Sequence, residues 1–211
     1  GAADMTASPQ GRSLELYFID GKPDGMLTAE VFNWTGHVLM APRTRFAAAL
    51  KRKEARYTGI YLLLGEKEGS PCAYIGESEN IADRLKNHDQ KKDWWTKAVI
   101  VTTGADSLHK AHVRYLEARL VEIARQVGRV PLENGNSPGG ASLSEAAQAN
   151  MEAFLDYLLM VLTALRIDMF IEYAKPTQTA EPPTLPQTTP RFELINKKRD
   201  LRANATLQGD D

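Results

Sequence analysis

Tyrosine, arginine and histidine side chains occur in the middle of the chain at spacings that could form one anion-binding site able to move a proton. Tyr61 and Tyr74 lie in two short β-type segments joined by a turn, so their hydroxyls can project from one face of an antiparallel pair. Arg84 and His88 are one helical turn apart in the segment that follows. Together they would present an anion-binding guanidinium beside an imidazole.

The segments around these residues predict an α+β unit with a small antiparallel three-stranded central sheet flanked by helices. Residues 58–64 and 72–76 are rich in β-formers and are joined by a short turn, so they should pair antiparallel. Residues 94–101 indicate a third strand. Helices are predicted over residues 79–90 and 107–127.

This unit is expected to span residues 57–140. The segments on either side of it are predicted to be extensions outside its core. Residues 14–56 should form an N-terminal β-hairpin or meander and a short basic helix, and residues 141–173 a C-terminal helix. Residues 174–211 indicate a Pro- and Thr-rich linker and tail, which is consistent with the start of a further domain. Residues 1–13 are expected to be disordered or an expression remnant.

The sequence from Gly59 to Asn134 resembles the GIY-YIG nuclease family. The resemblance rests on an ordered series: the triplet 59–61 (GIY), the triplet 74–76 (YIG), an Arg and a His on the next helix, a Glu on a later helix and a closing Asn. A lone triplet means little, whereas the whole series in this order is a specific signal. Of the two asparagines in the closing loop, Asn134 is preferred to Asn136 because of its distance from Glu117 and its Asn-Gly context.

Similarity to this family implies a metal-dependent endonuclease that hydrolyses phosphodiester bonds in DNA, with RNA as the other substrate left open. Glu117, in the middle of the later helix, would hold one divalent cation, Mg²⁺ or Mn²⁺, together with water. Arg84 would clamp a non-bridging phosphate oxygen. Tyr61 would act as general base; a free tyrosine has a pKa of about 10, so it would need nearby positive charge.

The remaining members of the series are implied to assist. Tyr74 and His88 would orient the attacking water and Tyr61, or one of them would share the role of base. Asn134 would position Glu117 or the scissile phosphate.

Each of these residues also has an ordinary structural interpretation. The tyrosines could be half-buried strand residues, and Arg84 and Glu117 could form ion pairs on helix surfaces. His88 could be a charge near a helix C-terminus, and Asn134 before a glycine is a common turn signal. The alternative function is therefore a non-catalytic module that binds nucleic acid or a protein partner on the same scaffold.

Charge is unevenly distributed, although the net charge is only −1. Residues 41–129 contain 17 Lys and Arg against 11 Asp and Glu, whereas both ends of the chain are acidic. A basic face would attract phosphate, but a solvated surface of mixed charge explains the same count equally well. Trp94 and Trp95, preceded by Lys91 and Lys92, could stack on bases and hold the nucleic-acid backbone, or could instead be core and solvated residues.

Composition points to a reducing compartment. Cys72 is the single cysteine, so no internal disulfide can form, and no secretory signal is recognisable at the N-terminus; a cytoplasmic location is expected. The most apolar stretch, residues 154–165, is too short to cross a bilayer, so no membrane partner is expected. The oligomeric state stays open, since cutting two strands with one site per chain requires a dimer or two successive nicks.

Overall fold

The computed structural model describes residues 10–135, 139, 142–173, 192–196 and 201–205. The chain divides into two compact units, residues 1–172 and residues 173–211. The second unit contains two antiparallel strands, β7 (Phe192–Asn196) and β8 (Leu201–Ala205). Most of the expected N-terminal disordered segment (residues 1–9) and of the expected linker (174–191) lies outside the described residues.

The first unit is built on one six-stranded sheet in which all neighbouring strands are antiparallel, in the order β1-β2-β3-β6-β4-β5. Its strands are β1 (Leu14–Phe18), β2 (Leu27–Val31), β3 (Gly36–Pro42), β4 (Gly59–Lys67), β5 (Ser70–Ser78) and β6 (Trp95–Thr103). The prediction of a small three-stranded central sheet is therefore wrong. β3 pairs with β6, so the N-terminal strands belong to the same sheet as the two tyrosine strands.

The physical reason for this larger sheet lies in β6. Nearly all of its residues are buried, including consecutive residues that point to opposite faces, such as Val99 and Ile100. A long apolar strand that is buried on both faces is typical of the interior of a sheet. β4 supplies one neighbour and β3 the other, with Leu39 opposite Ile100.

Strands β4 and β5 form a longer hairpin than the sequence indicated. Their pairing continues to Lys67 opposite Ser70, and only Glu68 and Gly69 remain in the turn. Both turn residues have positive φ, 53° and 80°, as a two-residue hairpin turn of type I′ requires. The expected seven-residue loop is thus mostly strand, which extends the platform that carries the tyrosines.

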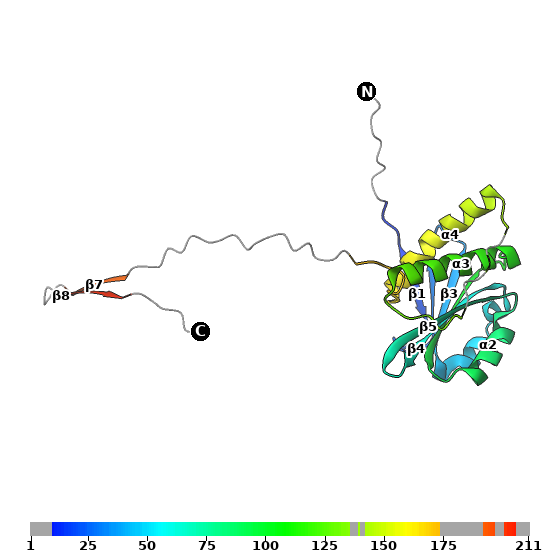
Figure 1. Ribbon diagram of the computed structural model, residues 1–211, viewed down its shortest axis with the longest axis horizontal. Coiled ribbons are helices and arrows are strands. Elements are labelled where there is room, and N and C mark those ends of the chain that lie inside the picture. Colours follow the sequence, from blue (N-terminus) through cyan, green and yellow to red (C-terminus); the bar gives the residue numbers. More distant parts are fainter. Residues whose placement is uncertain (1–9, 136–138, 140–141, 174–191, 197–200, 206–211) are drawn as a thin grey trace, which may run out of the picture. The chain divides into compact units, whose positions relative to one another are not determined.

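Helices cover both faces of the sheet. α3 (Lys110–Val127) and α4 (Glu145–Ala164) lie over one face, and α2 (Ile81–Lys91) lies over the other (Figure 1). Alternation along β4 separates the two cores, because Ile60 and Leu62 point toward α3 and α4 while Tyr61 and Leu63 point toward α2. Among the described residues, no helix is both long enough and apolar enough to cross a membrane.

The segment between β3 and β4 is less regular than predicted. In place of the one short basic helix expected within residues 14–56 there are three short helices, η1 (Arg43–Arg45), α1 (Phe46–Leu50) and η2 (Lys53–Arg56). Phe46 anchors it by packing edge-on against Trp95, with ring centroids 5.1 Å apart. These short helices share the α2 side of the sheet.

Candidate active site

A pocket of about 400 Å³ lies along the outer edge of β5, where α2 from one face of the sheet and α3 from the other approach the same strand. It brings together four of the residues predicted to form the site. Its lining residues are Tyr61, Tyr74, Gly76, Glu77, Ser78, Glu79, Arg84, Lys110 and Glu117. Because β5 is the last strand of the sheet, side chains from both faces can meet around it.

The two tyrosines share one face of the sheet but are not directly opposite each other. Tyr61 faces Gly76 across the β4–β5 pair, and Tyr74 faces Leu63. The two rings are stacked at a tilt of 27°, with centroids 6.1 Å apart. A Cβ atom at position 76 would collide with the Tyr61 ring and hydroxyl, so the glycine of the second triplet makes the space that this ring occupies.

Arg84 reaches this tyrosine pair from α2. Its Nε donates a hydrogen bond to the Tyr61 hydroxyl oxygen at 3.3 Å. This hydrogen bond, with the nearby phenol groups, raises the pKa of Arg84, so the guanidinium is cationic at any pH the protein experiences. The spacing prediction that placed Arg84 and Tyr61 in one site therefore corresponds to a direct contact.

Burial dominates the electrostatics of Tyr61. The residue has no exposed surface, and this burial raises the pKa of Tyr61 well above its usual range; the hydrogen bond from Arg84 lowers it, but by less. The expected positive charge is thus present, yet it does not compensate for the loss of water around the phenol. With these residues alone, Tyr61 stays protonated at neutral pH.

Glu117 enters the pocket from α3 and lies near a second carboxylate, Glu77. Burial, followed by the negative charge of Glu77, raises the pKa of Glu117 to about 7, and the positive charge of Lys110 opposes that shift. Lys110 Nζ lies 2.7 and 2.9 Å from the two carboxylate oxygens of Glu77. The pocket is thus lined by three carboxylates, those of Glu77, Glu79 and Glu117, beside the Lys110 ammonium and the Arg84 guanidinium.

Sequence reasoning missed Glu77 and the role of Lys110. Glu77 directly follows the second triplet, at the end of an edge strand, and its side chain is only 13% exposed. A carboxylate next to the tyrosine strand was the available signal, but surface glutamates are too common for position alone to single it out.

The donor set of this pocket fits a hard divalent cation. The described residues contain no group of three or more His, Cys, Asp or Glu side chains that could hold a metal ion. Glu117 and Glu77 offer carboxylate oxygens, which suit Mg²⁺ or Mn²⁺ when water and phosphate complete the coordination shell. The crowding of two carboxylates that raises the pKa of Glu117 would be relieved by a cation.

Asn134 is placed outside the pocket, on the edge of β5. Its Oδ1 accepts a hydrogen bond from the Ile75 amide at 3.0 Å, and its Nδ2 donates to the Ile75 carbonyl at 2.7 Å. Leu132 forms a parallel bridge with Ala73 just before it. The loop therefore continues the sheet, and the Asn134 amide imitates a peptide group of a further strand instead of contacting Glu117.

His88 lies on α2, one turn after Arg84, but its side chain is outside the described part of the structure. The two tryptophans after that helix are core residues, because Trp95 is fully buried and Trp94 is 9% exposed. Neither can stack on an exposed base in this arrangement. Lys92 lies close to the site, with Nζ 3.1 Å from Glu133 and 4.8 Å from the centre of the Tyr74 ring.

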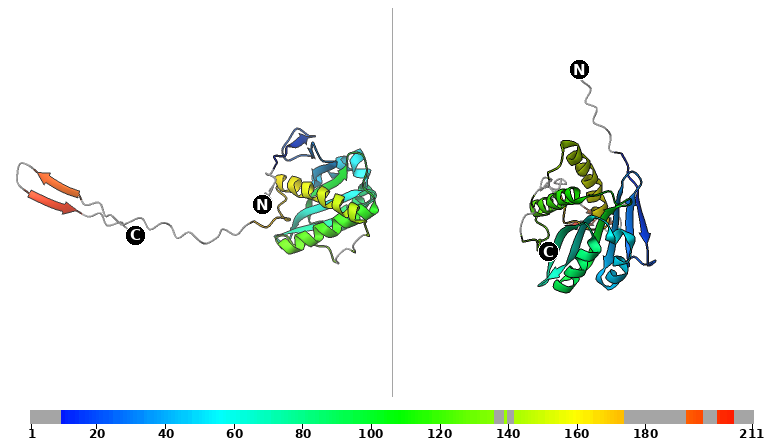
Figure 2. Two further views of the ribbon diagram at one scale, coloured as in Figure 1. Left: turned by 90° about the horizontal axis from the view of Figure 1, so that it is seen from above. Right: turned by 90° about the vertical axis from the view of Figure 1, so that its right-hand side faces the viewer.

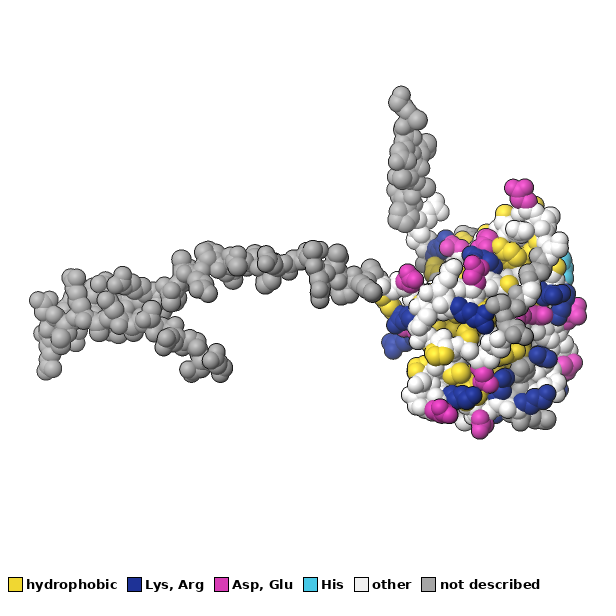
Figure 3. Space-filling model, viewed as in Figure 1, with side chains coloured by type: hydrophobic (Ala, Val, Ile, Leu, Met, Phe, Trp, Pro, Cys, Tyr) yellow, Lys and Arg dark blue, Asp and Glu magenta, His cyan; other side chains and the backbone are white. Residues whose placement is uncertain are grey.

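Surface charge does not by itself mark a nucleic-acid face. Figure 3 shows Lys and Arg side chains interspersed with Asp and Glu over the face it presents. Several basic residues near the middle of the chain are also committed to local contacts; Arg43, for example, lies over the Trp95 ring at 4.2 Å. The basic count of residues 41–129 thus includes groups that hold the fold together.

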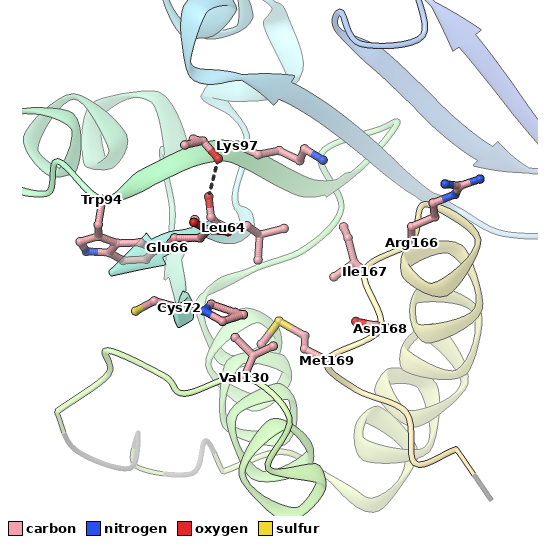
Figure 4. Close-up of a pocket in the computed structure, with 13 residues that line it drawn as sticks. Leu64, Glu66, Cys72, Trp94, Lys97, Val130, Arg166, Ile167, Asp168 and Met169 are labelled. Atoms are coloured by element: carbon pink, nitrogen blue, oxygen red, sulfur yellow. Dashed lines mark hydrogen bonds between the residues drawn. The ribbon is translucent and has the colours of Figure 1, made fainter. Parts of the chain in front are cut away.

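A larger pocket of about 480 Å³ lies at the other end of β4 and β5 (Figure 4). It is lined mainly by apolar groups, with Met169 from the segment after α4 facing Val130 from the segment after α3. Burial raises the pKa of the Cys72 thiol there, which disfavours the reactive thiolate. The smaller pocket is the better candidate site, because its charged groups converge and carry perturbed pKa values.

No protein-family model, no curated protein and no solved structure matches this chain. The function of the pocket must therefore be inferred from its own residues.

Proposed function

We propose that the chain is a metal-dependent endonuclease of the GIY-YIG type, acting on DNA at the pocket beside β5. The observation that carries this proposal is the convergence of Tyr61, Arg84 and Glu117, from β4, α2 and α3, on one pocket. These three types of group meet the needs of phosphodiester hydrolysis, which requires cations near the phosphate oxygens and a group that handles the proton of the attacking water.

Arg84 binds the phosphate in this proposal. Its guanidinium is permanently charged and presents several N–H donors in a planar fork, which matches the non-bridging oxygens of a phosphodiester. The contact with Tyr61 fixes the direction of the guanidinium before substrate arrives. Arg84 therefore aligns the phosphate with the tyrosine pair.

Glu117, with Glu77 beside it, would hold the divalent cation. A bound Mg²⁺ or Mn²⁺ would neutralise charge that develops on the phosphate oxygens. When no cation is bound, Lys110, which is paired with Glu77, reduces the repulsion between the carboxylates of Glu77 and Glu117. Tyr61 then handles the proton of the attacking water. Because burial holds it in its protonated form and Arg84 alone does not offset that burial, the bound cation would also be needed to favour the phenolate. Tyr74 orients the same water from its place beside Tyr61.

A second candidate function is a non-catalytic module that binds nucleic acid in the same pocket. The observation that favours it is the raised pKa of Tyr61, since a phenol that stays protonated is a hydrogen-bond donor and a poor base. In that case Arg84 and Lys110 would bind phosphate without cleavage.

Nicking of supercoiled plasmid DNA separates the two candidates. The wild type is compared in Mg²⁺, in Mn²⁺ and in chelator, with Glu117→Gln as the test variant and Glu122→Gln as its control on the exposed side of the same helix. Cation-dependent nicking that is lost in Glu117→Gln and kept in Glu122→Gln supports the nuclease. If the wild type binds DNA but nicks it in neither Mg²⁺ nor Mn²⁺, the nuclease proposal is wrong and the non-catalytic binding module is supported.

A further inference from the structure

The two edge strands of the six-stranded sheet differ in whether another segment of the chain hydrogen-bonds to their outer side. On the β5 edge, the loop from Pro131 to Asn134 bonds to the strand, since Ala73 donates to the Pro131 carbonyl at 3.1 Å and Asn134 pairs with Ile75. On the β1 edge, no further strand or loop of the described residues pairs with Leu14–Phe18 (Figure 2, dark blue). β1 is therefore an open edge strand in the part of the chain that the structure describes.

This open edge is also unusually apolar. Leu16, Tyr17 and Phe18 are 38%, 61% and 40% exposed, and Phe32, which directly follows β2, is 94% exposed. They make up four of the five large hydrophobic side chains that are exposed in the described part of the chain. β1 has no proline and no lysine, the residues with which proteins commonly block such an edge.

The direction of the main-chain groups of β1 follows from its pairing with β2. Ile19 donates to the Met26 carbonyl at 3.0 Å, which marks residues 19 and 26 as a hydrogen-bonded pair. Hydrogen-bonded pairs alternate along antiparallel strands, so Tyr17 with Thr28 and Glu15 with Glu30 are the next ones. The N–H and C=O groups of Leu14 and Leu16 and the N–H of Phe18 then point away from β2, toward the open side.

We propose that β1 pairs antiparallel with β1 of a second copy of this chain, around a two-fold axis that passes through Leu16. In this register Leu16 exchanges both main-chain hydrogen bonds with the partner's Leu16. Leu14 lies opposite the partner's Phe18, and Glu15 lies opposite the partner's Tyr17. The strand is self-complementary because its outward main-chain groups and its apolar side chains both fall on residues 14, 16 and 18.

Alternative registers are less favourable for stated reasons. An axis at Glu15 or Tyr17 would leave Phe18 or Leu14, respectively, opposite a residue outside the partner's β1, so two hydrogen-bonded pairs would form instead of three. An axis at Glu15 would also place two carboxylates directly opposite each other, which is destabilising. An axis at Phe18 would place its central pair of bonds on the Phe18 carbonyl, which already accepts from Gly21 at 3.0 Å, whereas the Leu16 axis involves that carbonyl only in the two outer Leu14–Phe18 pairs.

The proposed pairing also joins two hydrophobic cores. Leu14, Leu16 and Phe18 lie opposite Val31, Ala29 and Leu27 of β2, which belong to the core under α3 and α4. The apolar row on this face of β2 thus continues across β1 and into the partner's sheet. Each pocket lies at the opposite edge of its sheet, on β5, and stays open to substrate.

Disulfide trapping tests the register directly in the full chain. Leu16→Cys would place two cysteines in a hydrogen-bonded pair with Cα atoms about 5.5 Å apart, which is within disulfide range. Tyr17→Cys, the neighbouring exposed position, would hold its two copies about 8 Å apart, which is too far. Native Cys72 is buried, and wild type serves as its control. We expect a cross-linked dimer under mild oxidation for Leu16→Cys at a yield at least about fivefold above Tyr17→Cys.

Sedimentation velocity of wild type and of Leu16→Lys completes the test and needs no DNA, so it is independent of nuclease activity. We expect wild type to approach twice the chain mass of 23.4 kDa as concentration rises, and Leu16→Lys, with the same circular dichroism, to remain monomeric. A wild type that stays monomeric up to about 100 μM, a range that covers weak complexes, would overturn the proposal. Equal cross-linking of the two cysteine variants would overturn it as well.

Discussion

Arg84 donates a hydrogen bond from Nε to the hydroxyl oxygen of Tyr61 at 3.3 Å, although the two residues are 23 positions apart and lie on α2 and β4. The contact joins the residue best suited to bind phosphate with the one best suited to handle a proton. It lowers the pKa of Tyr61, while complete burial raises it by more. The pocket therefore depends on added positive charge for Tyr61 to act as a base.

Gly76→Ala tests the packing that holds Tyr61. The new Cβ atom would collide with the Tyr61 ring, so we expect a loss of stability of about 1–3 kcal/mol and displacement of the hydroxyl from Arg84. Thermal unfolding and plasmid nicking measure the two effects. Gly104→Ala is the matched control, since a Cβ atom there meets nothing within 4 Å. Equal behaviour of the two variants would show that Tyr61 is not held by this contact.

Glu117→Gln should change stability in a pH-dependent way when no cation is present. The pKa of Glu117 is raised to about 7 from the ordinary value of 4.5, so the folded protein favours the protonated form. Wild type therefore loses stability as pH rises from about 4.5 through 7, whereas the glutamine variant does not.

Because Glu117 is partly exposed, we expect solvent screening to reduce the gain to about 1 kcal/mol, or about 2–4 °C in Tm, at pH 8. Little difference should remain at pH 4.5. Calorimetry in chelator measures the effect, with Glu122→Gln, which replaces a glutamate whose side chain is 53% exposed, as the matched control. If the difference in Tm between wild type and Glu117→Gln were the same at both pH values, the claim that burial raises the pKa of Glu117 would be wrong.

Lys110→Gln should tighten cation binding. Lys110 contacts both oxygens of Glu77 and opposes the positive charge of an incoming metal ion. Removing one unit charge at this distance should strengthen Mn²⁺ binding by roughly three- to tenfold. Titration calorimetry compares it with Lys86→Gln, which removes the same charge from an exposed position on α2. Weaker binding in Lys110→Gln would mean that the two carboxylates do not hold the cation.

Asn134→Ala separates a structural role from a catalytic one. The side chain makes two hydrogen bonds with the main chain of Ile75, so we expect a loss of stability of about 1–3 kcal/mol. Below the unfolding transition, the nicking rate should change little. The opposite pattern, unchanged Tm with a large loss of nicking, would support the role that the family resemblance implied, in which Asn134 positions Glu117 or the scissile phosphate. Asn87→Ala on the surface of α2 is the control.

The sequence allowed part of this site to be predicted, because the relevant spacings are local. Tyr61 and Tyr74 are joined by one hairpin, and Arg84 lies on the helix that follows directly. The pairing of β3 with β6 brings His37 opposite Thr102 and depends on tertiary context, so a sheet of three strands was expected where there are six. The role of Asn134 was missed for a similar reason, since its partner is the main chain of a distant strand edge. The pKa of Tyr61 depends on burial that no local pattern reports.

The nicking rate of Tyr61→Phe with Mg²⁺ or Mn²⁺ tests the central claim most directly. The control is Tyr115→Phe, which removes another phenol of the chain, one that donates from α3 to Glu152 of α4 at 2.6 Å. We expect wild type and Tyr115→Phe to nick plasmid DNA at similar rates, and Tyr61→Phe to be slower by about 100-fold or more. A folded Tyr61→Phe protein that nicks as fast as wild type would contradict the proposed site.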